Sequence, residues 1–213
     1  MYEKEVYIIG AGTYGEVMLE LAQTLQYKVK GFYDEDEKKL SKKINDITVL
    51  GKFSNLTSQD IYKKQFIVAI GNNSLRHSIM KKINQVGGIT PTLIHPTCVI
   101  SPSAKIGMGV YIQANAYIWT EVSIDDFCII SPHVVVAHHS KLGKACLVSI
   151  QSGIGASIVI EDEVFIGIGS SIVTGISIIG KNTVIGAGSV VLKDVEKNSV
   201  YAGVPARKLR DVK

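Results

Sequence analysis

A six-residue repeat constrains the fold of this chain more than any other feature of its sequence. From residue 94 to residue 172 every sixth position holds Ile, Val or Leu, and after a slip of one residue the repeat resumes at 179, 185 and 191. The residue four places after each aliphatic is usually small, and Gly often follows the aliphatic directly. A period of six fits neither an α-helix nor the strands of simple hairpins. Short repeats of this kind predict a parallel β-helix, in which each repeat supplies one strand and one corner and the stacked coils bury the aliphatics.

Residues 1–90 follow a different pattern, in which strand and helix signals alternate. Strands are expected within 5–10, 27–36 and 65–73, and helices within 15–25 and 74–88. The helix period of the first helix is carried by Val17, Leu21 and Leu25, which are spaced by four. Such alternation predicts a small parallel βαβ sheet. The chain is therefore predicted to contain a Rossmann-like βαβ domain at 1–90 and a β-helix with a C-terminal tail at 91–213.

Composition excludes several classes of protein. The net charge of +4 is too small to indicate a nucleic-acid partner, although it suits small polyphosphate ligands. No apolar run is long enough to cross a bilayer and the first residues do not resemble a signal peptide, so we expect a cytoplasmic protein without a membrane partner. Cys98, Cys128 and Cys146 are widely spaced and form no CxxC motif, which predicts reduced, buried thiols.

The stretch GAGTYG at 10–15 is a G-x-G-x-x-G sequence between a predicted strand and a predicted helix. Asp34 follows about twenty residues later, as in dinucleotide-binding domains, so the motif alone indicates NAD. A domain of about ninety residues is too short for both mononucleotide halves, and the rest of the chain forms the β-helix. We therefore predict that the loop binds the diphosphate of a nucleotide sugar at a helix N-terminus. Gly10, Gly12, Thr13 and Tyr14 are the expected contacts.

Two further strand ends are predicted to reach the same edge of the sheet, where ligands of α/β domains bind. Asp34 and Asp36 are candidates for hydrogen bonds to the base or ribose. Gly71 and Asn72, in the stretch AIGNN, are candidates for contacts to the nucleotide or sugar. Ordinary turn chemistry is the alternative for the asparagines, and it is equally good for Asn73.

The repeats resemble a known family. The hexads IGKNTVIGAGSV at 179–190, followed by YAGVPARKL at 201–209, resemble the hexapeptide-repeat acyltransferases. The resemblance implies a left-handed β-helix with eighteen residues in each coil, a homotrimer, and acetyl-CoA bound in the groove between subunits. The start VYIIGAGTYGE at 6–16 joined to such a helix is similar to one subfamily. That subfamily contains the N-acetyltransferases of nucleotide-linked 4-amino-4,6-dideoxysugars and the sialic acid O-acetyltransferase-like proteins.

The stretch VAHHSKLG at 136–143 resembles the segment that carries the catalytic base of this subfamily. The match implies that His138 is the general base, at a corner two residues after the inward Val136, where a neutral imidazole is suited to take a proton from an amine. An acidic residue usually follows the base, and here His139 stands in its place as a second catalytic candidate. Glu121 and Asp125 are candidates to supply the missing carboxylate. No metal site is expected, because the other histidines are scattered and a metal needs three or four ligands.

The acetyl-CoA site is predicted from stacking and from the resemblance. Ala156 lies eighteen residues after His138, so its amide is a candidate donor to the oxyanion of the transition state. Gly155 would let the pantetheine arm approach the backbone closely. Gly175 and Ala187 are expected to line the groove towards the adenine end.

Together these features predict a trimeric acetyl-CoA-dependent N-acetyltransferase. Its substrate would be the C4 amine of a dTDP-, UDP- or GDP-linked 4-amino-4,6-dideoxyhexose destined for a surface glycan such as O-antigen lipopolysaccharide. The alternatives are an O-acetyltransferase acting on a sugar such as sialic acid, a non-catalytic nucleotide-sugar scaffold, and a nicotinamide-dependent enzyme. The sequence leaves open the nucleotide, the stereochemistry of the sugar and the length of the acyl group.

Overall fold

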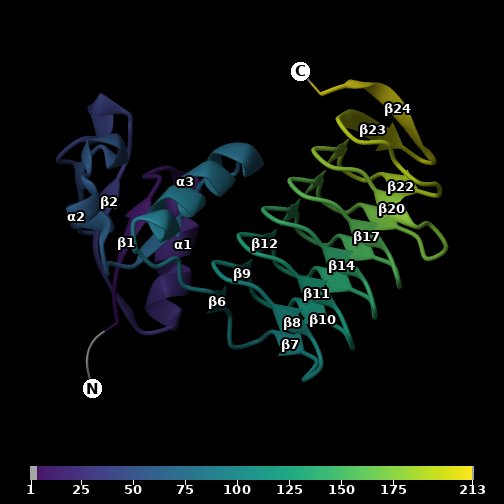
Figure 1. The fold of residues 1–213 in the computed structure, drawn as a ribbon, viewed down its shortest axis with the longest axis horizontal. Helices are drawn as coiled ribbons and strands as arrows, with labels where there is room; N and C mark the ends of the chain where they lie inside the picture. The colour runs from purple at the N-terminus through teal and green to yellow at the C-terminus, as the bar shows by residue number, and fades with distance from the viewer. Residues whose placement is uncertain (1–3, 213) are drawn as a thin grey trace. The chain divides into compact units, whose positions relative to one another are not determined.

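The computed structural model describes residues 4–212 and divides the chain into two compact units, Met1–Leu93 and Ile94–Lys213. Figure 1 shows the helices and the small sheet of unit 1 and the stacked coils of unit 2. Each unit has its own core. Among residues 4–212, no helix has both the length and the apolar character needed to cross a membrane.

Unit 1 is a five-stranded sheet in the order β3-β4-β2-β1-β5, with helices in the connections. Strands β4, β2, β1 and β5 run parallel, and β3 pairs antiparallel with β4. The parallel strands and the two long helices confirm the predicted βαβ pattern. The elements are β1 (Lys4–Ile9), α1 (Thr13–Thr24), β2 (Tyr27–Tyr33), η1 (Glu37–Lys39), β3 (Lys43–Ile44), β4 (Ile47–Gly51), η2 (Phe53–Asn55), α2 (Ser58–Ile61), β5 (Phe66–Val68) and α3 (Asn73–Gln85).

The buried face of helix α1 is centred beside the predicted row of Val17, Leu21 and Leu25. Leu21 is buried, but Val17 is 45% exposed, and the buried face is completed by Met18 and Leu19. The reason is that α1 packs against β1 and β2 with residues that recur at spacings of three and four, whereas a single row spaced by four drifts off the buried face. The core of unit 1 is therefore formed by this face of α1 and by the apolar strands β1 and β5.

Unit 2 is a parallel β-helix, as predicted from the repeat. Three sheets run along it, in the orders β22-β19-β16-β13-β10-β7, β20-β17-β14-β11-β8 and β24-β23-β21-β18-β15-β12-β9-β6. As far as β19, the paired short strands are eighteen residues apart, as Tyr117 and Val135 are. Every third hexad therefore returns to the same sheet, which makes each coil triangular.

The strands of the coils are each two residues long, because every hexad must also make a corner. They are β6 (Leu93–Ile94), β7 (Val99–Ile100), β8 (Lys105–Ile106), β9 (Tyr111–Ile112), β10 (Tyr117–Ile118), β11 (Ser123–Ile124), β12 (Ile129–Ile130), β13 (Val135–Val136), β14 (Lys141–Leu142), β15 (Leu147–Val148), β16 (Gly153–Ile154), β17 (Val159–Ile160), β18 (Phe165–Ile166), β19 (Ser171–Ile172), β20 (Ile178–Ile179), β21 (Val184–Ile185) and β22 (Val190–Val191). A hairpin of β23 (Ser199–Gly203) and β24 (Ala206–Asp211) follows the last coil.

The repeated aliphatics point inward and form one continuous core. From Ile112 onward every one of them is buried, and those of the first hexads, such as Ile94, pack against the same core while partly exposed. Cys128 and Cys146 are buried in this core, Cys98 is half-buried, and all three are free thiols, as expected. The one-residue slip lies between β19 and β20, where Gly175 has φ +105°, and it changes the pairing distance from eighteen residues to nineteen.

Candidate functional site

His138 and His139 occupy the corner that follows strand β13 and precedes β14. His138 is half-buried and His139 is exposed, in a left-handed backbone conformation with φ +61°. The corner is bonded to both neighbouring coils, because the His139 amide donates to the Thr120 carbonyl and the Ser157 amide donates to the His138 carbonyl. The ladder of the β-helix therefore holds both rings at the outer edge of the coil, as the position after Val136 suggested.

The two imidazole rings contact each other. Their Nδ1 atoms lie 3.1 Å apart, and the rings meet edge to face with centroids 5.2 Å apart. Trp119 stacks on the other side of His138, with ring centroids 6.1 Å apart and planes inclined by 30°. The engaged Nδ1 leaves Nε2 as the nitrogen of His138 that is available to a substrate.

The carboxylates considered as partners of His138 lie elsewhere. Glu121 occupies the turn one coil below, at the register position of His139, where its amide donates to the Ser103 hydroxyl. In the part of the chain that the structure describes, its carboxylate makes no hydrogen bond or ion pair with either histidine. Asp125 follows strand β11 on another sheet, where its side chain accepts from the Asp126 amide. Within residues 4–212, the polar partner of the His138 ring is His139 and no carboxylate bonds to it.

Ala156 and Gly155 form the corner directly above His138. The Ala156 amide donates to the Thr174 hydroxyl at 3.1 Å, so this predicted oxyanion donor already has an acceptor. Gly155 packs against the backbone of the next coil, because a Cβ there would meet the carbonyl carbon of Val173 at 2.8 Å. Gly155 is therefore needed for coil stacking, in addition to any approach of a ligand.

The remaining residues predicted for acetyl-CoA lie on two different corners. Gly175 is exposed in the turn between β19 and β20, on the same corner of the coil as His138 and Ala156. Ala187 is exposed after β21, on the corner between the third sheet and the first. The structure thus brings Gly155, Ala156 and Gly175 together and puts Ala187 on the opposite side of the first sheet.

The glycine-rich loop of unit 1 connects β1 to α1. Gly10 has φ +103°, and a Cβ there would lie 2.7 Å from the Ala69 carbonyl oxygen, so the position requires Gly. Gly12 is the N-cap of α1 and makes no side-chain cap bond, and the loop is open around its Cα. Thr13 is exposed at the first helical position. An uncapped N-terminus of a twelve-residue helix presents amide groups to an anion.

Asp34 braces this loop from the end of β2. Its carboxylate accepts from the Ala11 amide at 2.7 Å, from the Asp36 amide at 2.9 Å and from Lys39 Nζ at 3.0 Å. Burial works to raise the pKa of Asp34, but the two amide hydrogen bonds and Lys39 outweigh it, so the pKa lies below its ordinary value. Asp36 caps the short helix η1 by accepting from the Lys38 amide.

The segment after β5 is held by a buried arginine. Arg76 on α3 is fully buried and donates to the Ile70 carbonyl at 3.0 Å and to the Asn73 side chain at 2.9 Å. Asn72 is the N-cap of α3 and accepts from the Leu75 amide, so it has the capping role that the turn-chemistry alternative predicted. Gly71 is exposed beside it. Burial raises the pKa of the Tyr14 phenol well above its ordinary value, with the Arg76 charge acting in the opposite direction.

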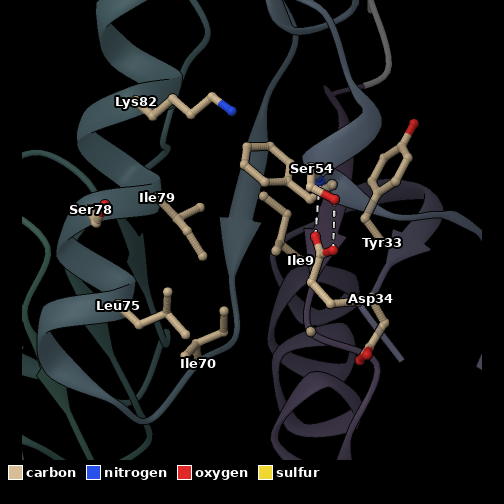
Figure 2. Close-up of a pocket in the computed structure, with 12 residues that line it drawn as sticks. Ile9, Tyr33, Asp34, Ser54, Ile70, Leu75, Ser78, Ile79 and Lys82 are labelled. Atoms are coloured by element: carbon tan, nitrogen blue, oxygen red, sulfur yellow. Dashed lines mark hydrogen bonds between the residues drawn. The ribbon is translucent and has the colours of Figure 1, made fainter. Parts of the chain in front are cut away.

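A cavity of about 510 Å³ opens at this carboxyl edge of the sheet. Figure 2 shows Leu75, Ile79 and Lys82 on α3 facing the side that carries Ile9 and Ser54. The cavity is lined by Ile9, Gly10, Tyr33, Asp34, Glu35, Phe53, Ser54, Ile70, Leu75, Ser78, Ile79 and Lys82. Apolar walls suit a flat nucleobase, and the few polar groups can orient it.

Several of these cavity residues were missed by the sequence interpretation. The Glu35 carboxylate accepts from the amide and the hydroxyl of Ser54, at 2.9 and 2.7 Å, and this pair forms part of the wall (Figure 2). Lys82 Nζ lies 5.5 Å from the centre of the Phe53 ring. Phe53 and Ser54 belong to η2, which lies in a polar stretch without periodicity, so only the general rule that ligands bind at this edge pointed to them.

Two family models match the chain. The PglD N-terminal domain matches residues 5–83, and the bacterial transferase hexapeptide model with six repeats matches residues 103–138. These matches cover the βαβ unit and part of the β-helix, in the order in which the chain carries them.

Curated relatives and solved structures resemble both units. GDP-perosamine N-acetyltransferase of Escherichia coli O157:H7 is 32% identical over 186 residues, which cover 85% of this chain and 82% of that protein. Galactoside O-acetyltransferase of Escherichia coli K12 is 35% identical, but over 50% of this chain and 53% of that protein. PerB from Caulobacter crescentus, solved in complex with CoA and GDP-perosamine, is 30% identical, with a TM-score of 0.84 and 96% of each chain covered. The chain therefore belongs to the family of hexapeptide-repeat sugar N-acetyltransferases, which join a PglD-type N-terminal domain to a left-handed β-helix.

Proposed function

We propose that this protein transfers the acetyl group of acetyl-CoA to the amine of a nucleotide-linked 4-amino-4,6-dideoxyhexose. GDP is the nucleotide we favour, because a relative 32% identical over 85% of this chain is named a GDP-perosamine N-acetyltransferase and PerB was solved with GDP-perosamine bound. The product would enter the synthesis of a surface glycan. A sugar O-acetyltransferase is less well supported, since that relative matches about half of the chain.

The observation that carries this proposal is the cavity beside the uncapped N-terminus of α1. A nucleoside diphosphate has a flat base and an anionic diphosphate, and unit 1 offers an apolar cavity whose wall includes Gly10, in the loop that leads to the N-terminus of α1. An acetyltransferase that acts on a free sugar needs neither feature. Lys82, at the rim of the cavity, adds positive charge for an anionic ligand.

His138 supports the catalytic part of the proposal. The amine attacks the thioester carbonyl and must lose a proton as the new C–N bond forms, and Nε2 of His138 is the base for that proton. The residues Gly155, Ala156 and Gly175 on the same corner are the proposed contacts of acetyl-CoA. For the Ala156 amide to serve the oxyanion, the Thr174 hydroxyl that now accepts from it would have to yield or share it.

Exposed apolar residues support a homotrimer. The outward positions of the first sheet include Val99, Tyr117 and Val135, which are 59, 42 and 38% exposed and lie in one row of neighbouring coils. Burying such a row against other copies of the chain would remove apolar surface from water. Sedimentation velocity of the full chain tests this assembly.

The experiment that tests the function measures thiol release from acetyl-CoA with GDP-, UDP- and dTDP-linked 4-amino-4,6-dideoxyhexoses. We expect turnover with the GDP sugar and a loss of about 10²-fold or more in His138→Ala. His133→Ala is the matched control, because His133 is an exposed histidine in an equivalent turn on a different corner and should not affect the rate. Turnover with free sugars but with no nucleotide sugar would refute the proposal.

A further inference from the structure

The contact between His138 and His139 has a consequence for how the base works, and this inference rests on the proposed acetyl transfer. Two imidazole nitrogens 3.1 Å apart form a hydrogen bond when one carries a proton and the other does not. The tautomer of one ring therefore determines the tautomer of the other. If His139 donated, the neutral His138 would carry its proton on Nε2 and could not accept another there. If His138 donates, its Nε2 is free.

We propose that His139 is the positioning residue of this base: its Nδ1 accepts the Nδ1–H of His138 and keeps Nε2 of His138 free for the substrate. In the reaction the substrate nitrogen bonds to the acetyl carbonyl carbon and the bond from that carbon to the CoA sulfur breaks. One amine proton passes to Nε2 of His138, and the same proton then goes to the CoA thiolate. His139 needs no net change of charge during this cycle.

The neutral partner changes the electrostatics of the base. A carboxylate would hold a fixed negative charge beside His138 and would favour its protonated form before substrate binds. His139 holds the same tautomer without that charge. Glu121 is the titratable residue on the corner below, and the corner above carries Ala156 and Ser157, which do not titrate. Replacing His139 by Asp would add that negative charge beside His138, so the acid limb of this variant should lie at higher pH than that of the wild type.

Trp119 contacts the face of the His138 ring that His139 leaves uncovered. Its indole lies against His138 with planes inclined by 30°, so it restricts the rotation of the imidazole. The face of an indole also attracts a cation at this distance, which favours the imidazolium as it forms in the reaction. The indole of Trp119 does not titrate near neutral pH, so it favours the imidazolium without adding a charge to the enzyme before the reaction.

Three variants at position 139 test the proposal in the full-length protein. His139→Asn keeps an acceptor oxygen and a residue type that tolerates the left-handed backbone. His139→Ala removes the acceptor, and Ala145 shows that Ala occupies the same kind of turn in this chain, with φ 55°. His139→Asp supplies a charged acceptor. We expect near wild-type turnover for Asn, a loss of about 10-fold or more for Ala, and an acid limb of the kcat/KM profile about one pH unit higher for Asp.

Nitrogen NMR of histidine-labelled protein gives a readout that does not depend on turnover. We expect His138 to be protonated at Nδ1 and bare at Nε2 in the wild type, and to lose this preference in His139→Ala. A proton on Nε2 of His138, or identical acid limbs for the wild type and His139→Asp, would overturn the proposal. If no nucleotide sugar is acetylated, the proposed function fails by itself, while the NMR result still decides whether His139 sets the tautomer.

Discussion

Gly155 offers a direct test of how tightly the coils around His138 are stacked. A Cβ at this position would lie 2.8 Å from both the Thr174 hydroxyl oxygen and the Val173 carbonyl carbon, and closer still to the Thr174 amide nitrogen. Most of these neighbours are backbone atoms of the next coil, so a rotamer change cannot relieve the overlap. Gly155→Ala must therefore push two coils apart, which also strains the hydrogen bond from Ala156 to Thr174.

The expected cost follows from that overlap. Overpacking of a well-packed interior costs about 1–3 kcal/mol. A domain of this size loses about 2–4 °C in Tm for each kcal/mol, so Gly155→Ala should melt about 2–12 °C below the wild type. Because the same coil bonds to the His138 carbonyl through Ser157, we also expect slower acetyl transfer at temperatures where the variant is folded.

Gly153→Ala is the matched control for this variant. Gly153 lies two residues earlier in the same hexad, and apart from its neighbours in sequence no atom of residues 4–212 lies within 4 Å of its added Cβ. Its Tm should stay within about 1 °C of the wild type or rise slightly, since Ala restricts the unfolded chain more than Gly does. Gly153 continues the outward row of Val135, so sedimentation velocity of the same samples must show unchanged assembly. Circular dichroism melts at equal protein concentration compare the three proteins. Equal shifts for the two variants, or no shift for Gly155→Ala, would refute the stacking argument.

Three other substitutions test separate parts of the molecule. Asp34→Asn should lower Tm at about pH 7 and have little effect at about pH 3. Hydrogen bonds lower the pKa of Asp34 in the folded state despite burial. The stabilisation by the ionised carboxylate is therefore present at neutral pH and is lost as the pH falls through the folded pKa. Ser140→Ala should lower the free energy of unfolding by about 1–3 kcal/mol, because its buried hydroxyl donates to the Gly155 carbonyl at 2.7 Å and accepts from the Ile158 amide at 3.1 Å. Ser177→Ala, at an exposed position outside the outward row of the first sheet, should be neutral in the same melts. Lys82→Ala should weaken GDP binding measured by calorimetry without changing Tm, and equal GDP affinity in the variant would remove Lys82 from the nucleotide site.

The fold of unit 2 was predictable from sequence because one physical rule repeats in every hexad. An aliphatic at each sixth position faces the core, and the structure buries all of those from Ile112 onward. The stacking of His138 below Ala156 follows from the same register of eighteen residues. The placement of Ala187 was harder, because a small residue in a GAG sequence carries no information about which of the three corners it occupies. Counting hexads from β16 to β21 shows that Ala187 lies on a different corner from Ala156. Comparing the small residues of the two stretches does not show this.

Unit 1 was less predictable where local signals were weak. The hairpin β3–β4 turns at Asn45 and Asp46, which both have positive φ. An Asn-Asp pair between apolar residues is a hairpin signal. A search for the helix and strand periods alone does not detect it. The cavity wall formed by Phe53 and Ser54 depends on the packing of η2 against the sheet edge, and no periodic pattern encodes that contact. The partner of Asp34 likewise follows from three-dimensional structure, since Ala11 lies 23 residues away.

The hydrogen bonds of Asp34 explain why the G-x-G-x-x-G motif with a following Asp, which is typical of NAD-binding domains, occurs in a chain of this family. In the dinucleotide fingerprint an acidic residue after the second strand is understood as a ribose ligand. Here the same carboxylate holds the Ala11 amide and Lys39, and Gly10 is required by its own backbone and by the Ala69 carbonyl. Both motif residues are thus accounted for by contacts within the protein. The motif therefore specifies the strand, the loop and the start of the helix, and the identity of the ligand has to be inferred from the cavity walls at Phe53, Ile79 and Lys82.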